Sequence, residues 1–360
     1  MFAASRLVMI TVIVLSRQIV PRGPHVAVSM QEEHGGTLLD ILTQWDGFWY
    51  RYIAEHGYGA PTPSVDAAFF PLYPLAIKAV AFVVRDFQVA SLLVSNGSLI
   101  AGMLILRALL RLDYEELTTR RVITFLMFSP ASFFLSAAYT ESMFLLLSVG
   151  ALFAARRQKW FVSGICGALL TATRPPGVLI IAPLLAEHFV QWRDDRAALR
   201  RVFRPTLLFL GLVPLGLALY FLYWYILRGD WLLPMHAQQE FWKKSLAWPW
   251  QSFLWPQNFP PSHIPLYQAI VGPALIVAGA GFFVRIRATY LVYALVALVF
   301  YLSWDTLEGL PRYLSVLFPI HLVMALLSMR WRWLFEPLLA FSVALFAYCV
   351  LLFANAYQMT

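Results

Sequence analysis

Residues 88–121 read QVASLLVSNGSLIAGMLILRALLRLDYEELTTRR, an apolar run with four arginines at and beyond its end. About 20 mostly apolar residues are enough to cross the hydrocarbon core of a bilayer as one helix. Arginines gathered just past such a run are typical of the cytoplasmic side of a membrane protein. This stretch therefore predicts a membrane-spanning helix that ends in the cytoplasm.

The rest of the chain repeats this pattern. Of its 360 residues, 60% are hydrophobic and 13% are charged, whereas a soluble domain has about 45–50% apolar and about 25% charged residues. The polar stretches are too short to bury a core of their own. We expect a single integral membrane domain over residues 1–360, an all-α bundle of about eleven spanning helices. A soluble enzyme with one membrane anchor is excluded.

The net charge of +8 follows from topology rather than from nucleic-acid binding. Most basic residues lie in short clusters between apolar runs, as cytoplasmic loops do, and no soluble basic face exists. These residues are Arg6; Arg107, Arg111, Arg120 and Arg121; Arg156, Arg157 and Lys159; Arg193, Arg196, Arg200, Arg201 and Arg204; Arg285 and Arg287; Arg330 and Arg332. This placement puts the turns Tyr139–Ser142 and Arg174–Gly177, and the segment from Trp304 to Arg312, outside the cytoplasm.

Two longer segments are also expected outside. Residues 7–20 resemble a signal peptide but lack a clear cleavage site, so we interpret them as an anchor that runs outward. Residues 21–87 then form a first extracytoplasmic loop, in which the run 67–84 does not cross because it contains Pro71, Pro74 and Lys78. Residues 228–264 form a second loop, rich in tryptophan and proline. It is either an interfacial lid over a lipid or an aromatic belt.

The first loop contains the densest polar and aromatic run, QWDGFWYRYIAEHGYG at residues 44–59. Ile41, Leu42, Trp45, Phe48, Trp49, Tyr52 and Ile53 recur at helical spacing, which predicts a helix lying in the membrane interface. Asp46 would lie beside this stripe. It is either a solvated carboxylate or a general base held where a lipid-linked substrate meets water.

Several motifs carry a resemblance to a known family. Trp45-Asp46, Trp49-Tyr50, Ile53-Ala54, Glu55–Tyr58 and Phe69–Pro74 resemble the signature of the GPI mannosyltransferase 2 (PIG-V-like) family and its prokaryotic relatives. Further similar motifs follow in order: Ser129–Ala131 with Ala138–Ser142, Ala172–Pro175, Pro311–Tyr313 and Phe318-Pro319. The resemblance covers residues 45–319.

The resemblance implies a type C glycosyltransferase fold that takes a sugar from a polyprenyl- or dolichyl-phosphate carrier outside the cytoplasm. It also implies an essential acid in the first outer loop, which matches Asp46. The reaction would be an inverting transfer of a hexose, mannose by the family name, to a hydroxyl of a lipid, glycan or protein. The membrane would be the plasma membrane in a prokaryote and the endoplasmic reticulum in a eukaryote.

Arginine matches the oxygens of a phosphate with a planar fork of donors, so Arg174 and Arg312 are candidate ligands of the carrier phosphate. Alternatively, both merely extend to the interface. Glu141 is either a second acid, orienting the acceptor or an arginine, or a helix-start carboxylate with Thr140 as cap. The remaining candidate substrate-binding residues are Trp45, Tyr50, His56, Tyr313 and Asp305.

We expect neither a metal site nor a cofactor. The seven histidines are dispersed, and Cys166 and Cys349 lie in apolar runs without metal or disulfide spacing. The main alternative function is a transporter or lipid-carrier flippase, which would place its polar residues near the bilayer midplane. A non-catalytic subunit of another glycosyltransferase is a third possibility. In each case the expected partners include membrane lipids.

Overall fold

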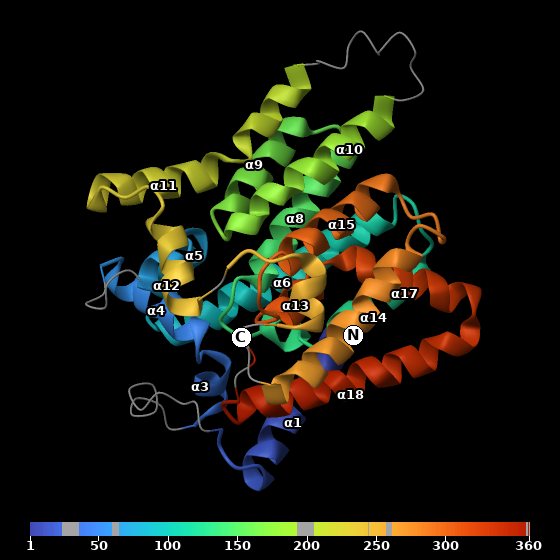
Figure 1. Ribbon diagram of the computed structural model, residues 1–360, viewed down its shortest axis with the longest axis horizontal. Coiled ribbons are helices and arrows are strands. Elements are labelled where there is room, and N and C mark those ends of the chain that lie inside the picture. The colour runs from blue at the N-terminus through green and yellow to red at the C-terminus, as the bar shows by residue number, and fades with distance from the viewer. Residues whose placement is uncertain are drawn as a thin grey trace.

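The computed structural model describes residues 1–23, 36–59, 65–192, 205–243, 245–256, 261–357 and 359. Over these residues the chain forms helices joined by loops, and β pairing is limited to one bridge between Leu246 and Trp304 (Figure 1). The predicted all-α fold is confirmed.

The described helices follow one another along the chain, and several are short 3₁₀ segments (η). As far as residue 192 they are α1 (Phe2–Ile19), α3 (Leu38–Leu42), α4 (Asp46–His56), η1 (Val65–Ala68), α5 (Leu72–Val84), α6 (Phe87–Leu110), α7 (Glu116–Met127), η2 (Ser132–Leu135), α8 (Glu141–Arg156), α9 (Trp160–Thr171), η3 (Pro175–Ile180) and α10 (Ile181–Trp192). From residue 205 they are η5 (Pro205–Leu212), α11 (Leu215–Arg228), α12 (Leu233–Trp242), α13 (Pro249–Leu254), η6 (Pro261–His263), α14 (Ile264–Ala280), α15 (Ala288–Leu302), α16 (Leu310–Ser315), α17 (Phe318–Arg330), η7 (Arg332–Leu334) and α18 (Phe335–Ala354).

Among the described residues, five helical stretches are long and apolar enough to cross a membrane. They are Phe2–Ile19, Phe87–Leu110, Thr206–Arg228, Pro261–Ala280 and Arg332–Ala354. Four further apolar helices are shorter: α5, α9, α15 and α17. The protein is thus an integral membrane protein, while the count of eleven spanning helices and the loop boundaries stay predictions.

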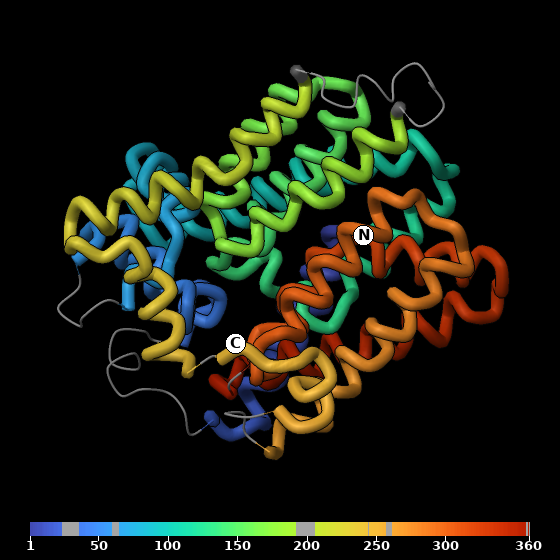
Figure 2. Tube along the Cα trace, turned by 45° about the horizontal axis from the view of Figure 1, so that its top comes forward, coloured from blue at the N-terminus to red at the C-terminus, as the bar shows by residue number. Residues whose placement is uncertain are grey.

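Helix α8 is the centre of the bundle and packs against α6, α9 and α10. Gly102 allows α6 to approach closely, because a Cβ at this position would lie only 3.2 Å from the Cα of Leu146 in α8. Around this centre α7 packs on α17 and α10 on α15. The first and last helices, α1 and α18, pack against each other (Figures 1 and 2).

The prolines of the Phe69–Pro74 motif begin a helix rather than interrupt one. Pro71 is the N-cap of α5 and Pro74 lies in its first turn, where the backbone N–H groups have no partner within the helix. We had used these prolines only to argue that the run does not cross the membrane, and a helix at this place agrees with that argument. At 13 residues, α5 is about 20 Å long, short of the about 30 Å hydrocarbon core. That it does not cross stays a prediction.

The helices of the first loop are fixed by tyrosine hydroxyl groups that donate to backbone carbonyls. Tyr73 donates to the carbonyl of Ser91 at 3.0 Å, and Tyr58 to that of Phe69 at 2.7 Å. Tyr220 of α11 donates to the carbonyl of Ala67 at 2.9 Å. These bonds hold α4, η1 and α5 against α6 and α11, so α4 has one defined position.

The apolar stripe predicted across residues 41–53 is interrupted. Helix α3 ends at Leu42 and α4 begins at Asp46, so the two segments do not share one helical phase. The residues of α4 that are buried are Gly47, Tyr50, Ile53 and Ala54, whereas Phe48, Trp49 and Tyr52 are half-buried.

Several of the predicted cytoplasmic charges have partners within the protein. Arg6 is buried and donates to the Ser136 hydroxyl at 2.6 Å, so its interpretation as a loop charge was wrong. Glu187 of α10 is also buried and accepts two hydrogen bonds from Arg287, each at 2.8 Å. Arg156 pairs with Asp113 at 2.9 Å. The 193–204 cluster lies outside the described residues.

Candidate active site

Asp46 is the first residue of α4, and the backbone just before it is strained. Trp45, the N-cap, has φ 58° and ψ −124°, a conformation that a residue with a side chain rarely adopts. Such strain costs about 1–3 kcal/mol and persists only where the surroundings enforce it. The surrounding structure therefore holds the backbone at Trp45 in one conformation. This conformation fixes the position of Asp46 at the start of α4.

The surroundings that enforce it come from two distant segments. The backbone N–H of Ala138 donates to the carbonyl of Leu42 at 2.8 Å, and the side-chain amide of Gln44 donates to the carbonyl of Phe353 at 2.7 Å. A Cβ at Gly47 would lie 3.2 Å from the Cβ of Ala138, so a side chain here would crowd Ala138. The start of α4 is thus packed against the turn that precedes α8.

Asp46 forms an ion pair with Arg312, which lies on the short helix α16. Oδ2 of Asp46 is 2.6 Å from Nη1 of Arg312, although the two residues are 266 positions apart in the sequence. Both side chains are largely buried, with exposures of 16% and 8%. A charge-assisted contact in such surroundings is stronger than one at an open surface.

Arg312 also forms an ion pair with Glu141, the first residue of α8. Its Nε lies 3.0 Å from Oε1 of Glu141, but the N–H direction does not fit a hydrogen bond, so this contact is an ion pair. Arg174, the N-cap of η3, pairs with the same Oε1. Two carboxylates and two guanidinium groups therefore alternate in one row, from four separate segments of the chain.

Aromatic rings enclose the two arginines. The centre of the Arg312 guanidinium lies 5.2 Å from the ring of Tyr139, 5.3 Å from Tyr313 and 5.5 Å from Phe134. Arg174 lies 5.2 Å from the same Tyr313 ring. The faces of aromatic rings attract cations within about 6 Å, so the cage holds both guanidinium groups in place.

Burial and charge together determine the protonation of these groups. Burial opposes the charge on Arg312, but the adjacent carboxylates of Glu141 and Asp46 outweigh it and hold the pKa of this guanidinium well above its ordinary value. Burial also raises the pKa of Tyr50, one turn along α4 from Asp46, to about 12. The site thus combines fixed cations with a neutral phenol.

Three buried polar atoms beside this row have no hydrogen-bond partner within the protein. They are Nε1 of Trp45, Oγ1 of Thr140 and Oε2 of Glu141. Thr140 is the N-cap residue of α8 and Glu141 begins the helix, as one of our two interpretations had it, but the Thr140 side chain makes no capping hydrogen bond. Buried polar atoms are nearly always paired, so an unpaired donor, an unpaired hydroxyl and an unpaired acceptor in one place mark where a polar ligand would be bound.

The structure brings Trp45, Asp46, Tyr50, Glu141, Arg174, Arg312 and Tyr313 together, but not His56 or Asp305. His56 is ten residues further along α4, about 15 Å away, and its exposed ring stacks on Tyr52. It cannot hydrogen-bond Asp46.

Asp305 accepts from the backbone N–H of Ser245 at 3.0 Å and from its hydroxyl at 2.6 Å. This carboxylate attaches the tryptophan-rich 228–264 segment to the turn that follows α15. Residues 244 and 257–260 of that segment lie outside the described residues.

The sequence interpretation missed Tyr139 and Phe134 as walls of the arginine cage. Tyr139 was quoted only as part of an outer turn, and its hydroxyl donates to the carbonyl of Gln44 at 3.2 Å. In the parts of the chain that the structure describes, no three His, Cys, Asp or Glu side chains are close enough to hold a metal ion.

Comparison with known proteins gives the family and the fold. A family model described as "Mannosyltransferase (PIG-V)" matches residues 16–228, more than half of the chain. GPI alpha-1,6-mannosyltransferase 2 of Homo sapiens is 30% identical over 216 residues, which is 56% of this chain and 43% of that protein. The same enzyme of Rattus norvegicus is 32% identical over 162 residues, 41% of this chain and 32% of that protein. The chain thus spans less than half the length of these relatives.

Two solved structures share the architecture. ArnT from Cupriavidus metallidurans bound to undecaprenyl phosphate superposes with a TM-score of 0.56 at 12% identity, over 99% of this chain and 76% of that chain. The same protein in the apo state gives a TM-score of 0.52. At this identity the likeness is one of fold, and it agrees with the type C glycosyltransferase-like bundle expected from the sequence.

Proposed function

The chain belongs to the PIG-V mannosyltransferase family, and from this premise we propose that it transfers a hexose, mannose by family, from a polyprenyl-phosphate carrier to an acceptor hydroxyl. The observation that carries the proposal is the buried row Asp46–Arg312–Glu141–Arg174. Such a row offers a carboxylate for a proton and guanidinium groups for a phosphate at one place. The fold likeness to a protein bound to undecaprenyl phosphate supports a polyprenyl-phosphate carrier.

Asp46 is the general base in this proposal. The acceptor oxygen forms a bond to the anomeric carbon of the sugar as the bond from that carbon to the carrier phosphate breaks. The proton of the acceptor hydroxyl moves to Asp46, and the polyprenyl phosphate leaves with the electron pair. A carboxylate accepts a proton only in its charged form, and Asp46 is held in an ion pair with Arg312.

Arg312 and Arg174 bind the phosphate of the carrier. The leaving group is already charged, so it needs hydrogen-bond donors more than it needs a proton, and arginine presents several in one plane. Arg312 has its Nη1 on Asp46, so one side chain joins the base to the leaving-group site. The phosphate contact would then align the anomeric carbon with Asp46.

Glu141 acts as a positioning residue for the arginines rather than as a second proton acceptor. Its Oε1 contacts both Arg174 and Arg312, and the side chain is fully buried. Its free Oε2, with Thr140 Oγ1 and Trp45 Nε1, is available to the hydroxyl groups of the sugar. Of the two functions that we had proposed for this acid, the orienting one has the better support.

The test is sugar transfer in membranes containing the protein, supplied with radiolabelled polyprenyl-phosphate mannose. Asp46→Asn should abolish transfer to the lipid or protein fraction. Glu55→Gln is the matched control, since Glu55 is an exposed acid on the same helix. Transfer by wild type and by the Glu55 variant but not by Asp46→Asn supports the proposal, and equal transfer by all three removes Asp46 as the base.

The membrane side of the site is also part of the proposal. The positive clusters place Asp46 outside the cytoplasm, at the plasma membrane of a prokaryote or in the lumen of the endoplasmic reticulum. The acceptor is proposed only as a hydroxyl of a lipid, a glycan or a protein. A transporter without glycosyl transfer is not favoured, because the chain belongs to a mannosyltransferase family.

A further inference from the structure

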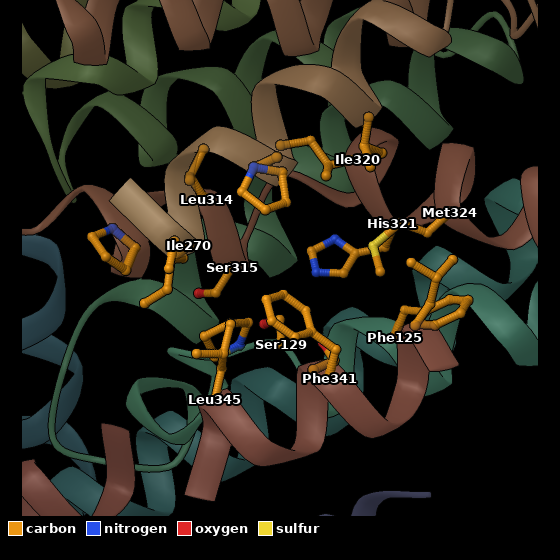
Figure 3. A pocket seen from close by; sticks show the side chains of 18 residues that line it. Phe125, Ser129, Ile270, Leu314, Ser315, Ile320, His321, Met324, Phe341 and Leu345 are labelled. Carbon is orange, nitrogen blue, oxygen red and sulfur yellow. The ribbon is translucent and has the colours of Figure 1, made fainter. Parts of the chain in front are cut away.

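A separate cavity of about 90 Å³ lies among α7, α14, α16, α17 and α18 (Figure 3). Its walls are mostly apolar, formed by side chains such as Phe125, Ile270, Met324 and Leu345. No charged side chain lines it. Apolar cavities of this kind stay dry or bind apolar molecules.

The cavity opens toward the hydrocarbon of the membrane. Ala269 and Pro273 on α14 are exposed, and Phe341 on α18 is 49% exposed, yet all three line the cavity. Both helices belong to stretches that are long and apolar enough to cross a membrane. Pro273 lies inside α14, where it cannot donate a backbone hydrogen bond. The gap between α14 and α18 is therefore an entrance for lipid rather than for water.

Two polar side chains stand out in this apolar space. Ser129 is only 6% exposed, and its hydroxyl has no hydrogen-bond partner in the protein. The ring of His321, 3% exposed, projects into the cavity (Figure 3). The hydroxyl of Ser315, by contrast, is already used, because it donates to the carbonyl of Arg312 at 2.6 Å.

The orientation of His321 defines what it offers a ligand. Its Nδ1 lies 3.3 Å from the carbonyl of Leu317, which can only accept, so Nδ1 carries a hydrogen. A charged imidazole would be costly among apolar walls, so the ring is neutral and its Nε2 is an acceptor. A ligand hydroxyl can donate to Nε2 of His321 and accept from the hydroxyl of Ser129.

We propose that this cavity binds the hydroxyl end of a neutral aliphatic alcohol, taken up from the bilayer between α14 and α18. The hydroxyl lies between Ser129 and His321, the first carbons fill the cavity, and the rest of the chain extends through the opening into the membrane. An anionic or cationic head group is excluded, since no wall residue would neutralise it.

The site is independent of the proposed transfer reaction but touches the helix that carries Arg312. Pro311, Leu314 and Ser315 of α16 line the cavity, while Arg312 contacts Asp46 and Glu141. A bound alcohol would therefore support α16 from its other side. Because the ligand binds only the folded protein, it should raise the melting temperature.

The experiment is photolabelling of the purified full chain in detergent with a diazirine derivative of octanol. Octanol and octane serve as competitors. We expect adducts on peptides containing Phe125, Met324 or Phe341. Octane should compete about five- to tenfold less well than octanol, the usual effect of one lost hydrogen bond. Octanol should also raise the melting temperature.

Ala274→Trp fills the cavity and should abolish both effects. The matched control is Ile276→Trp on the same helix, where the side chain is 75% exposed and lines no part of the cavity. His321→Phe nearly keeps the volume and removes the acceptor while Ser129 remains, so the preference for octanol over octane should decrease. This variant also provides a test should Ala274→Trp fail to fold.

Three results would overturn the proposal, each obtained with monodisperse protein. One is the absence of adducts on the lining residues of the wild type. Another is full labelling of those residues in Ala274→Trp. The third is equal competition by octane and octanol in the wild type, since the hydroxyl would then have no site.

Discussion

Replacing Arg312 by lysine should separate the two carboxylates that its guanidinium now connects. Nη1 contacts Asp46 at 2.6 Å and Nε contacts Glu141 at 3.0 Å, from different sides of one planar group. A lysine has a single ammonium and reaches only one of these carboxylates at a time. The charge is kept, but the fork that joins base and phosphate site is lost.

The size of the effect follows from the lost contact. A hydrogen bond to a charged group contributes about 1.5–3 kcal/mol, which corresponds to roughly a tenfold to 150-fold decrease in kcat/KM. The free energy of unfolding should decrease less in Arg312→Lys than in Arg312→Met. That variant leaves buried carboxylates without their cation, which costs about 3–5 kcal/mol.

Transfer from radiolabelled polyprenyl-phosphate mannose and the melting temperature should be measured on the same preparations. Arg332→Lys is the matched control, since Arg332 is exposed and lies in η7, outside the candidate site. Arg312→Lys with wild-type kcat/KM would refute the phosphate function. A loss explained entirely by a lower melting temperature would reduce Arg312 to a structural residue.

Three further predictions concern the surroundings of the site. Gly47→Val should lower the free energy of unfolding by about 1–3 kcal/mol and reduce transfer, because its side chain would be forced against Ala138; unchanged melting would contradict this packing. Glu187→Gln should destabilise the protein by about 3 kcal/mol, because Arg287 loses its buried partner, while transfer per folded molecule is kept. A decrease in that specific activity would connect the two sites. In a chain without native cysteines, Glu55→Cys and Glu115→Cys should label from opposite sides of the membrane, and labelling from one side would disprove the topology.

Charge and hydropathy patterns predicted which segments meet outside the cytoplasm. The clusters between apolar runs placed Asp46, Glu141, Arg174 and Arg312 at outer ends of helices, and the structure joins these four side chains in one row. Their meeting agrees with the expectation that these turns lie on one side of the membrane, while which side that is stays a prediction. The motif resemblance independently selected Asp46.

Pairing within the site could not be predicted from those patterns. They give no distances, so nothing in them says that Glu141 contacts two arginines or that Asp305 instead holds Ser245. His56 was a candidate because it lies in the same motif as Asp46, but the two are at opposite ends of α4. Tyr139 was missed because its contribution depends on packing with a segment far away in sequence.

Local rules also failed where tertiary structure changed their meaning. Prolines at residues 71 and 74 were counted as a cost to a helix interior, yet they lie at the start of α5, where proline is tolerated. Arg6 fitted the positive-inside pattern, but it is buried and bonded to Ser136. In both cases the general rule for the residue type holds. The effect of the residue depends on its position in the folded structure, which the sequence pattern does not give.

The most direct test of the central claim is to measure donor binding and sugar transfer on one purified sample of Asp46→Asn. The substitution keeps the size of the side chain and removes the charge that accepts the proton. We predict that the Kd for polyprenyl-phosphate mannose stays within about threefold of the wild-type value. The rate of transfer should fall by about 10²–10⁴-fold, as expected for the loss of a general base. Transfer within tenfold of wild type, with the protein folded and the donor bound, would contradict the account.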